Sequence, residues 1–206
     1  MTYKNNLHFG GVLYLDGWFW ANPVCTFKDN IYDSCRITDW SFTPPVTGNN
    51  AYINTTFRLS STNANDVVLS SLSYQTGPLG KYYQPTNSAL INVGSQNATN
   101  AGLYHYTTLT NQVKETNTVV DIGFHYVALN SSGLPFDGDS DGLPDYFEDV
   151  NGNGSVDTGE RSWLSADTDG DGVSDYWEWL LGRNPLITGT TNSASQTKLV
   201  TYTPLR

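Results

Sequence analysis

The sequence has few cysteines, few basic residues and no long apolar run, and each shortage excludes a class of protein. Its two cysteines, Cys25 and Cys35, are too few for a small fold held together by disulfides. No apolar run reaches the roughly 18 residues that a membrane-spanning helix needs. Because phosphate binding needs basic patches, 10 basic residues against 20 acidic ones disfavour a nucleic-acid partner. We therefore expect neither nucleic acid nor a membrane span.

The start of the chain and its cysteines leave alternatives open. The first residues, MTYKNNLHFGG, lack the apolar stretch of a signal peptide, so we expect a mature fragment or a cloned piece. Cys25 and Cys35 either pair and close a small loop or remain two buried thiols. Neither belongs to a CxxC motif or has a histidine nearby in the sequence, so neither is a catalytic candidate.

The composition favours a mainly β fold. Only 15% of residues are charged and 38% are hydrophobic, and the chain contains 13 tyrosines and 6 tryptophans. Abundant Thr, Ser, Asn and Gly accompany them, as in many extracellular β proteins. A length of 206 residues is enough for one or two domains with a real core.

The densest pattern lies between residues 137 and 178, where a twelve-residue calcium-loop template fits three times. Ca²⁺ takes roughly 6–8 oxygen ligands, including a Glu at position twelve, and the loop needs Gly at position six for its sharp turn. The predicted ligands of loops one, two and three are Asp137, Asp139, Asp141, Leu143, Asp145 and Glu148; Asp149, Asn151, Asn153, Ser155, Asp157 and Glu160; and Asp167, Asp169, Asp171, Val173, Asp175 and Glu178. Leu143, Ser155 and Val173 would bind through their main-chain carbonyls.

Charge supports this interpretation. The segment 137–178 holds 13 of the 20 acidic residues and one base, Arg161, for a formal charge of −12. So many acids close together repel one another without counter-ions. The alternative is a disordered acidic tract, but the interleaved aromatic residues argue against it. We expect about three Ca²⁺ ions and a segment that folds only when it binds them.

The three loops are not arranged as paired EF-hands, because Asp149 follows Glu148 directly and leaves no room for a helix. We expect short helical turns at 144–150 and 174–181, the second ended by Gly182. DSDGLPDYFED and DTDGDGVSDYWEWLLGRNP resemble the thrombospondin type 3 repeats of large secreted bacterial proteins, over about 137–185. The resemblance implies an extended, calcium-bound, extracellular segment. Loop two departs from the pattern with Asn151 and Asn153, which predicts a weaker site.

A weaker repeat precedes this segment. KNNLHF, KDNIYD and NNAYIN each place an asparagine before an aromatic residue or a histidine. Asn6, Asn30 and Asn50 are 24 and 20 residues apart, the length of one coil of a parallel β-helix. Stacked asparagines could then pair their amides. The alternative is chance similarity in an Asn-rich chain.

Strand-like runs lie between and after these repeats. They occupy residues 11–15, 26–32, 36–42, 56–59, 67–72, 101–110 and 118–130. In the last run, alternation predicts Ile122, Phe124 and Tyr126 on one side and Asp121, Gly123 and His125 on the other. A further strand is expected at 199–203.

NSALINVGS, AGLYHYTT and VDIGFHY are similar to the C-terminal end of secreted bacterial right-handed β-helix proteins, over roughly 48–128. The resemblance implies a short right-handed parallel β-helix of about three coils with a C-terminal cap. The expected domains are a β-helix-like domain at 1–130, calcium-binding repeats at 131–185, and a Ser/Thr linker with a strand at 186–206. Such families include polysaccharide lyases, hydrolases and adhesins, so the fold does not settle an activity.

Two classes of function follow. The first is a non-enzymatic calcium-binding module of a secreted or surface protein, serving adhesion, spacing or self-assembly through strand edges with other copies or an upstream β-helix. The second is the C-terminal part of a carbohydrate-active enzyme, or a carbohydrate-binding module, with an extracellular polysaccharide as partner. Trp18, Trp20 and Trp40 are the candidate sugar-binding residues. The three histidines are expected to be packed or hydrogen-bonded structural residues, and no catalytic residue is assigned.

Overall fold

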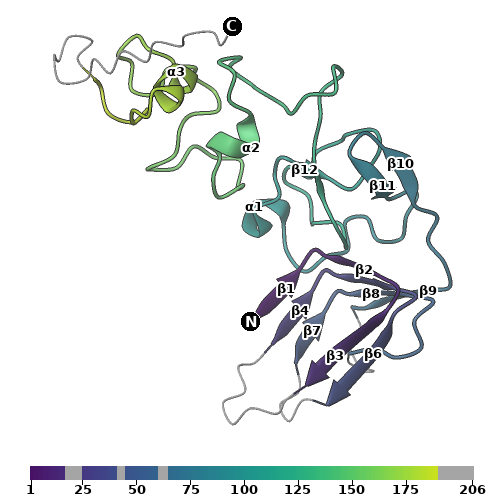
Figure 1. Cartoon of the computed structure of the whole chain (residues 1–206). Helices are drawn as coiled ribbons and strands as arrows, with labels where there is room; N and C mark the ends of the chain where they lie inside the picture. Colours follow the sequence, from purple (N-terminus) through teal and green to yellow (C-terminus); the bar gives the residue numbers. More distant parts are fainter. Residues whose placement is uncertain (17–24, 41–44, 60–64, 190–206) are drawn as a thin grey trace, which may run out of the picture.

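Parallel pairing of short strands organises the N-terminal part of the molecule (Figure 1). The computed structural model describes residues 1–16, 25–40, 45–59 and 65–189. The chain is mainly β, with parallel sheets and few helices. One sheet contains β1 (Thr2–Lys4), β4 (Thr26–Lys28) and β7 (Val46–Gly48); a second contains β2 (Leu7–Phe9), β5 (Ile31–Asp33), β8 (Ala51–Ile53) and β9 (Val67–Leu69); a third contains β3 (Val12–Asp16) and β6 (Arg36–Trp40).

The register of these sheets follows the predicted repeat. Leu7 pairs with Ile31, and Ile31 pairs with Ala51, so equivalent residues lie 24 and then 20 positions apart. The same offset of 24 holds in all three sheets, because Thr2 pairs with Thr26 and Val12 pairs with Arg36. The second pass of the chain (β4, β5 and β6) therefore adds one strand to each of the three sheets, and the third pass (β7 and β8) adds one strand to each of the first two.

Residues with left-handed backbone make the corners between successive strands. Asn5, Asp29 and Asn49 lie between the first and second strand of their passes, with φ of 55°, 60° and 53°. Asn and Asp tolerate this region because their short polar side chains bond locally. The KNN, KDN and GNN triplets of the repeat are therefore corner sequences.

An asparagine ladder runs along these corners and confirms the predicted amide pairing. The Oδ1 of Asn30 accepts hydrogen bonds from the main-chain N–H and the side-chain amide of Asn6, both at 3.1 Å. The Oδ1 of Asn50 accepts the same two bonds from Asn30, at 3.1 and 3.2 Å. Asp66 supplies a further rung, accepting the Asn50 N–H at 2.9 Å. The ladder satisfies corner main-chain groups that no strand pairs.

The buried core also contains equivalent residues from successive passes of the chain. One buried cluster contains Phe27, Tyr32, Cys35, Ile37, Tyr52 and Leu59, and a second contains Ile31, Ala51, Ile53, Leu90 and Ile122. The ring of Tyr32 stacks between those of His8 and Tyr52, with centroids 5.1 and 5.4 Å away. Stacked aromatic rings in register add attraction beyond the area they bury. Cys25 and Cys35 form no disulfide with each other, and Cys35 is buried in the first cluster.

Residues 75–130 form a less regular part beside the sheets. β10 (Gln75–Gly77) and β11 (Gly80–Tyr83) make an antiparallel hairpin, α1 (Ala98–Ala101) is a single turn, and β12 (Tyr106–Thr107) pairs with β13 (Tyr126–Val127). The predicted long strands at 101–110 and 118–130 are therefore wrong, and the residues at 56–59 form no strand.

Buried main-chain bonds explain why 118–130 is not a long strand. Ile122 N–H donates to Leu90 O and Gly123 N–H donates to Asp29 O, both at 2.9 Å. Gly123 has a φ of +121°, and a Cβ there would overlap the Ile31 side chain. Asp121 and Ile122 are both buried, so the predicted alternation of sides fails. The segment is fixed to the repeat core instead of to a sheet.

The acidic segment folds as loops with two short helices. α2 (Asp145–Glu148) and α3 (Asp175–Leu180) confirm the predicted helical turns. Gly182 follows α3 with a φ of +69°, as expected for a residue that ends a helix. The strand predicted at 199–203 lies outside the described residues.

The ladder predicts an unequal response to two asparagine substitutions. Asn30→Ala removes a fully buried side chain that accepts two bonds from Asn6 and donates to Asn50 and Tyr3. We expect the free energy of unfolding to fall by roughly 1–3 kcal/mol or more, because buried donors lose their acceptor. Urea unfolding followed by circular dichroism at fixed calcium measures it.

The matched control is Asn87→Ala, which removes an exposed amide with no hydrogen-bond partner among the described residues. Its unfolding midpoint should equal that of the unaltered chain. Equal midpoints for both variants would show that the ladder does not stabilise the fold.

Candidate metal centre

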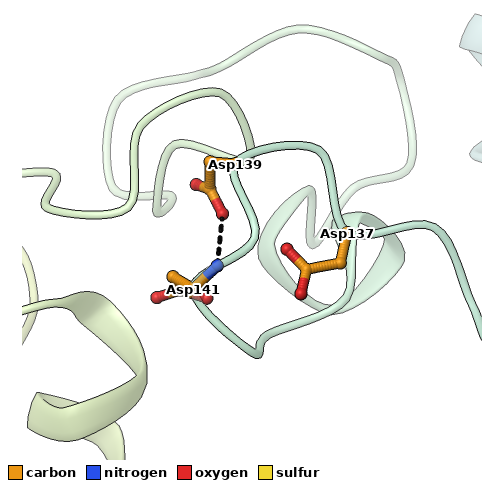
Figure 2. Close-up of side chains that lie close together, drawn as sticks. All are labelled: Asp137, Asp139 and Asp141. Carbon is orange, nitrogen blue, oxygen red and sulfur yellow. Dashed lines mark hydrogen bonds between the residues drawn. The ribbon is translucent and has the colours of Figure 1, made fainter.

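Two aspartate triplets bring their carboxylates together. Asp137, Asp139 and Asp141 each place one oxygen within 4.8 Å of the others, and Asp167, Asp169 and Asp171 do the same. Figure 2 shows the first triplet on a single tight loop, with the Asp141 N–H bonded to the Asp139 carboxylate. These are the residues predicted at positions one, three and five of loops one and three.

The loop main chain imposes this geometry, and all three loops do so in the same way. The position-one carboxylate accepts the N–H of the position-six glycine: Asp137 from Gly142 at 3.1 Å, Asp149 from Gly154 at 2.6 Å, and Asp167 from Gly172 at 2.8 Å. The position-three and position-five side chains each accept the N–H two residues on, at distances between 2.7 and 3.2 Å. The sequence spacing thus creates three equivalent turns before any ion is considered.

The position-six glycines are required by the backbone. Gly142, Gly154 and Gly172 have φ of +107°, +78° and +92°. An L side chain is strained there, and glycine is not.

The position-twelve glutamates of loops one and three are buried without hydrogen-bond partners. Glu148 is 0% exposed and Glu178 is 1% exposed. Both oxygens of Glu148 and the Oε2 of Glu178 have no partner among the described residues. Asp137 Oδ1, Asp139 Oδ2 and Asp169 Oδ2 are also buried without a partner. Each of these two loops therefore gathers carboxylate oxygens that no protein donor satisfies.

The surroundings of these two glutamates disfavour their ionised forms. Burial, and then the nearby charges of Asp139, Asp141 and Asp175, raise the pKa of Glu148 to about 8. Burial, and then Asp169, Asp171 and Asp175, raise the pKa of Glu178. Arg161 lies near Glu148 and lowers its pKa, but its guanidinium stacks on Phe147, 4.8 Å from the ring centroid, and donates to the Phe147 carbonyl. A cation bound among these carboxylates would offset this unfavourable charge.

The position-nine aspartates have other contacts. Asp145 accepts the Gly138 N–H at 2.6 Å, and Asp175 accepts the N–H and the hydroxyl of Thr168 at 2.9 and 2.5 Å. Both thus close their loops by bonding the residue at position two. Their assignment as metal ligands stays a prediction.

Loop two is built differently around its glutamate. Glu160 accepts the N–H groups of Asn151 and Asp157 at 3.0 and 3.2 Å, so its oxygens have partners. Asp157 is exposed and accepts the side-chain amides of Asn151 and Asn153 at 2.8 and 2.6 Å. No acid oxygen of loop two is among the buried ones without a partner, and the weaker site expected there stays a prediction.

Loop two also packs against the irregular β part. His105 is buried and its Nε2 lies 2.9 Å from Asp149 Oδ2. Because a carboxylate only accepts, Nε2 carries the proton, and burial keeps the ring neutral by lowering the pKa of His105. The Tyr104 N–H donates to Gly152 O at 3.0 Å, and Gly154 lies against the Tyr104 ring.

His105 is thus a hydrogen-bonded structural histidine, as predicted. Its partner, a predicted metal ligand, was not foreseen. No sequence signal pairs residues 44 positions apart, so only the structure shows this contact.

A second buried polar network lies inside residues 108–125. His125 places Nε2 2.8 Å from Glu115 Oε1 and Nδ1 2.9 Å from the Gly123 carbonyl. Asp121 accepts from the Asn92 N–H at 2.8 Å and from the Thr108 hydroxyl. Burial and the neighbouring Glu115 raise the pKa of Asp121. His125, Glu115 and Asp121 are each at most 7% exposed, and Glu115 bonds both of the others, so these polar groups satisfy one another inside the fold.

Trp18 and Trp20, two of the predicted sugar-binding residues, lie outside the described residues, and only the main chain of Trp40, at the end of β6, is described. Carbohydrate binding through these tryptophans therefore stays a prediction from the sequence.

No protein-family model matches this chain, and no curated protein does either. Within the described residues, no helix has the length and apolar character needed to cross a membrane.

The contact between loop two and the β part predicts different effects for two equivalent glycines. Gly154→Ala would place a Cβ inside the Tyr104 ring, whereas Gly172→Ala meets nothing within 4 Å. Both are position-six residues with positive φ, so the backbone strain is matched. We expect Gly154→Ala to lower the free energy of unfolding by roughly 1–3 kcal/mol more than Gly172→Ala, the usual effect of overpacking.

Thermal unfolding at saturating calcium measures this difference. Limited proteolysis should also cut the Gly154→Ala variant faster between the β part and loop two. Indistinguishable stabilities would show that loop two does not depend on Tyr104 for its position.

Proposed function

We propose that this chain is a non-enzymatic, calcium-binding structural module of a secreted or cell-surface protein. Residues 1–130 would form a short right-handed parallel β-helix with a C-terminal cap, and residues 131–185 would form thrombospondin type 3-like calcium loops. The role would be adhesion, spacing or assembly. The offsets of 24 and then 20 residues between paired strands, together with the asparagine ladder, support the β-helix.

The observation that carries the calcium assignment is the set of buried carboxylate oxygens without partners. In loop one they belong to Asp137, Asp139 and Glu148, and in loop three to Asp169 and Glu178. An oxygen-only donor set suits hard cations such as Ca²⁺, Mg²⁺ and Mn²⁺. Ca²⁺ fits best, because it accepts many carboxylate and carbonyl ligands in a flexible shell, whereas Mg²⁺ retains several waters.

The acids outside the loops support a non-enzymatic role. Asp29 is buried and accepts two bonds from Ser95, both at 2.6 Å. Asp66 ends the ladder, and Glu115 and Asp121 bond within their own network. These carboxylates are occupied by structural hydrogen bonds, and none of them faces a second carboxylate across an open groove among the described residues.

The edges of the sheets support assembly through strands. β1, β2 and β3 each pair on one side only among the described residues. Phe9, Val12 and Tyr14 on these strands are 56%, 48% and 68% exposed. Unpaired parallel edges with apolar side chains accept further strands. The partner would be another copy of the chain or an upstream coil of the same fold.

Calcium titration and chelation test the function. Calorimetric titration of the metal-free protein should show heat for about three ions, with the weakest at loop two. EDTA should expose 137–185 to proteases while leaving most of the β circular dichroism signal of 1–130 intact, because removal of the ions leaves closely spaced carboxylates that repel one another.

Mg²⁺ at the same concentration is the control for non-specific charge screening, and it should protect the segment much less. A chain that gives no heat with Ca²⁺, and whose proteolysis is unchanged by EDTA, would remove the proposed function.

Calcium binding should also release a proton from loop one. With a pKa of about 8, Glu148 is protonated in the metal-free fold at neutral pH, although its ordinary value is 4.5. That proton stabilises the metal-free fold at low pH, and the stabilisation is lost as the pH rises towards 8. The ion must displace this proton, so affinity at loop one should rise with pH up to about 8.

Titration in buffers of different ionisation enthalpy measures the release, which should approach about one proton at neutral pH and vanish well above the pKa. Glu148→Gln should bind calcium more weakly and without this proton. A release of the same size from Glu148→Gln would assign the proton to another group.

A further inference from the structure

We infer that loops one and three form one paired metal unit that binds two ions cooperatively, and that loop two lies outside this unit. The inference rests on the proposed function, because it concerns how the same ions bind. It departs from the order of the sequence, in which loops one and two are adjacent and share a boundary.

A main-chain hydrogen bond joins the two loops directly. The N–H of Tyr176, in the first turn of α3, donates to Asp141 Oδ2 at 2.8 Å. Asp141 is the position-five residue of loop one, and its other oxygen accepts the Leu143 N–H within the loop. The carboxylate that would bind the ion of loop one is therefore held in place by the helix that follows the turn of loop three.

Side-chain packing makes the same connection. The Tyr176 ring lies against Gly142, where a Cβ would be 3.4 Å from it. The ring of Trp179 on α3 meets that of Phe147 on α2 edge to face, with centroids 5.7 Å apart. Each helix carries the position-twelve glutamate of its own loop, Glu148 on α2 and Glu178 on α3. The packing of α2 on α3 therefore positions both glutamates at once.

The charges of the two loops also act on one another. Glu148 is fully buried with both oxygens unpartnered, and the negative charges that disfavour its ionised form include Asp175 of loop three. Asp175 also lies close enough to act on Asp139 of loop one. An ion in either loop neutralises charge that the other loop experiences.

These contacts give a physical reason for cooperativity. The first ion orders its own loop and, through the Tyr176 bond and the Trp179 contact, the helix of the other loop. The second ion then binds a loop that is already ordered, so less conformational entropy is lost. The coupling must be reciprocal: an ion in loop one strengthens loop three by the same factor. Loop two contacts His105 and Tyr104, and among the described residues it makes no hydrogen bond to loop three, so it should bind independently.

The test follows the amide resonance of Gly142 during a calcium titration of the ¹⁵N-labelled full chain, because this N–H donates to Asp137 and reports loop one. Loop three is disabled by Asp169→Asn with Glu178→Gln, and loop two by the matched pair Asp157→Asn with Glu160→Gln. We expect the calcium midpoint of loop one to rise by about tenfold in the first variant, within the usual range of coupling between sites. It should change less than about twofold in the second variant.

Two tryptophan variants test the contact without altering any predicted ligand. Trp179→Ala removes the contact with Phe147, and Trp177→Ala removes a more exposed ring whose contact is with its neighbour Tyr176. Only Trp179→Ala should make the binding curve of loops one and three less steep. This pair keeps the test decisive if the loop-three variant fails to fold.

The outcomes separate the two claims. If Gly142 responds to calcium equally in the loop-two and loop-three variants, and the two tryptophan variants behave alike, the loops bind independently and the pairing is wrong while the proposed function stands. If Gly142 of the unaltered chain does not respond to calcium, the proposed function fails for this loop, and the pairing fails with it.

Discussion

Carboxylates that are held together by their own main chain are the constraint on which the acidic segment depends. In each loop the N–H groups of a tight turn donate to the side chains at positions one, three and five, which fixes where those side chains point. In loops one and three, other oxygens of the acids are buried without a hydrogen-bond partner. Hydrogen bonding thus concentrates negative charge in these loops instead of dispersing it, and a bound cation would offset the resulting repulsion.

In the repeat part of the chain, neutral side chains accept the hydrogen bonds that the turns donate. Its corners also leave main-chain N–H groups without strand partners, and the amide oxygens of Asn30 and Asn50 accept them. An amide both donates and accepts, so it can continue from one pass to the next without accumulating charge. Asp66, the last acceptor in the ladder, only accepts, and burial raises its pKa. The repeat part and the acidic segment therefore differ in the charge of the side chains that accept hydrogen bonds from their turns.

Local chemistry could be predicted from the sequence, and long-range contacts could not. The loop turns follow from acid and glycine spacing, and the ladder follows from asparagines 24 and 20 residues apart. The rung at Asp66 was missed because it changes both the residue type and the spacing. The predictions of strands at 101–110 and 118–130 were wrong because β propensity does not predict a buried hydrogen-bond network such as that of His125 and Glu115. The contacts of loop two with His105 and of loop one with α3 depend on tertiary packing, which no motif encodes.

The constant register within each pass has a consequence for how the N-terminal part tolerates change in length. From the first to the second pass every strand is offset by 24 residues, and from the second to the third by 20. The four-residue difference therefore falls entirely between the end of β6 and the start of β7. Insertions and deletions in these links would leave the paired strands, the ladder and the aromatic stacks in place. Natural variation in size, and any peptide grafted by design, should accordingly accumulate between the last strand of one pass and the first strand of the next.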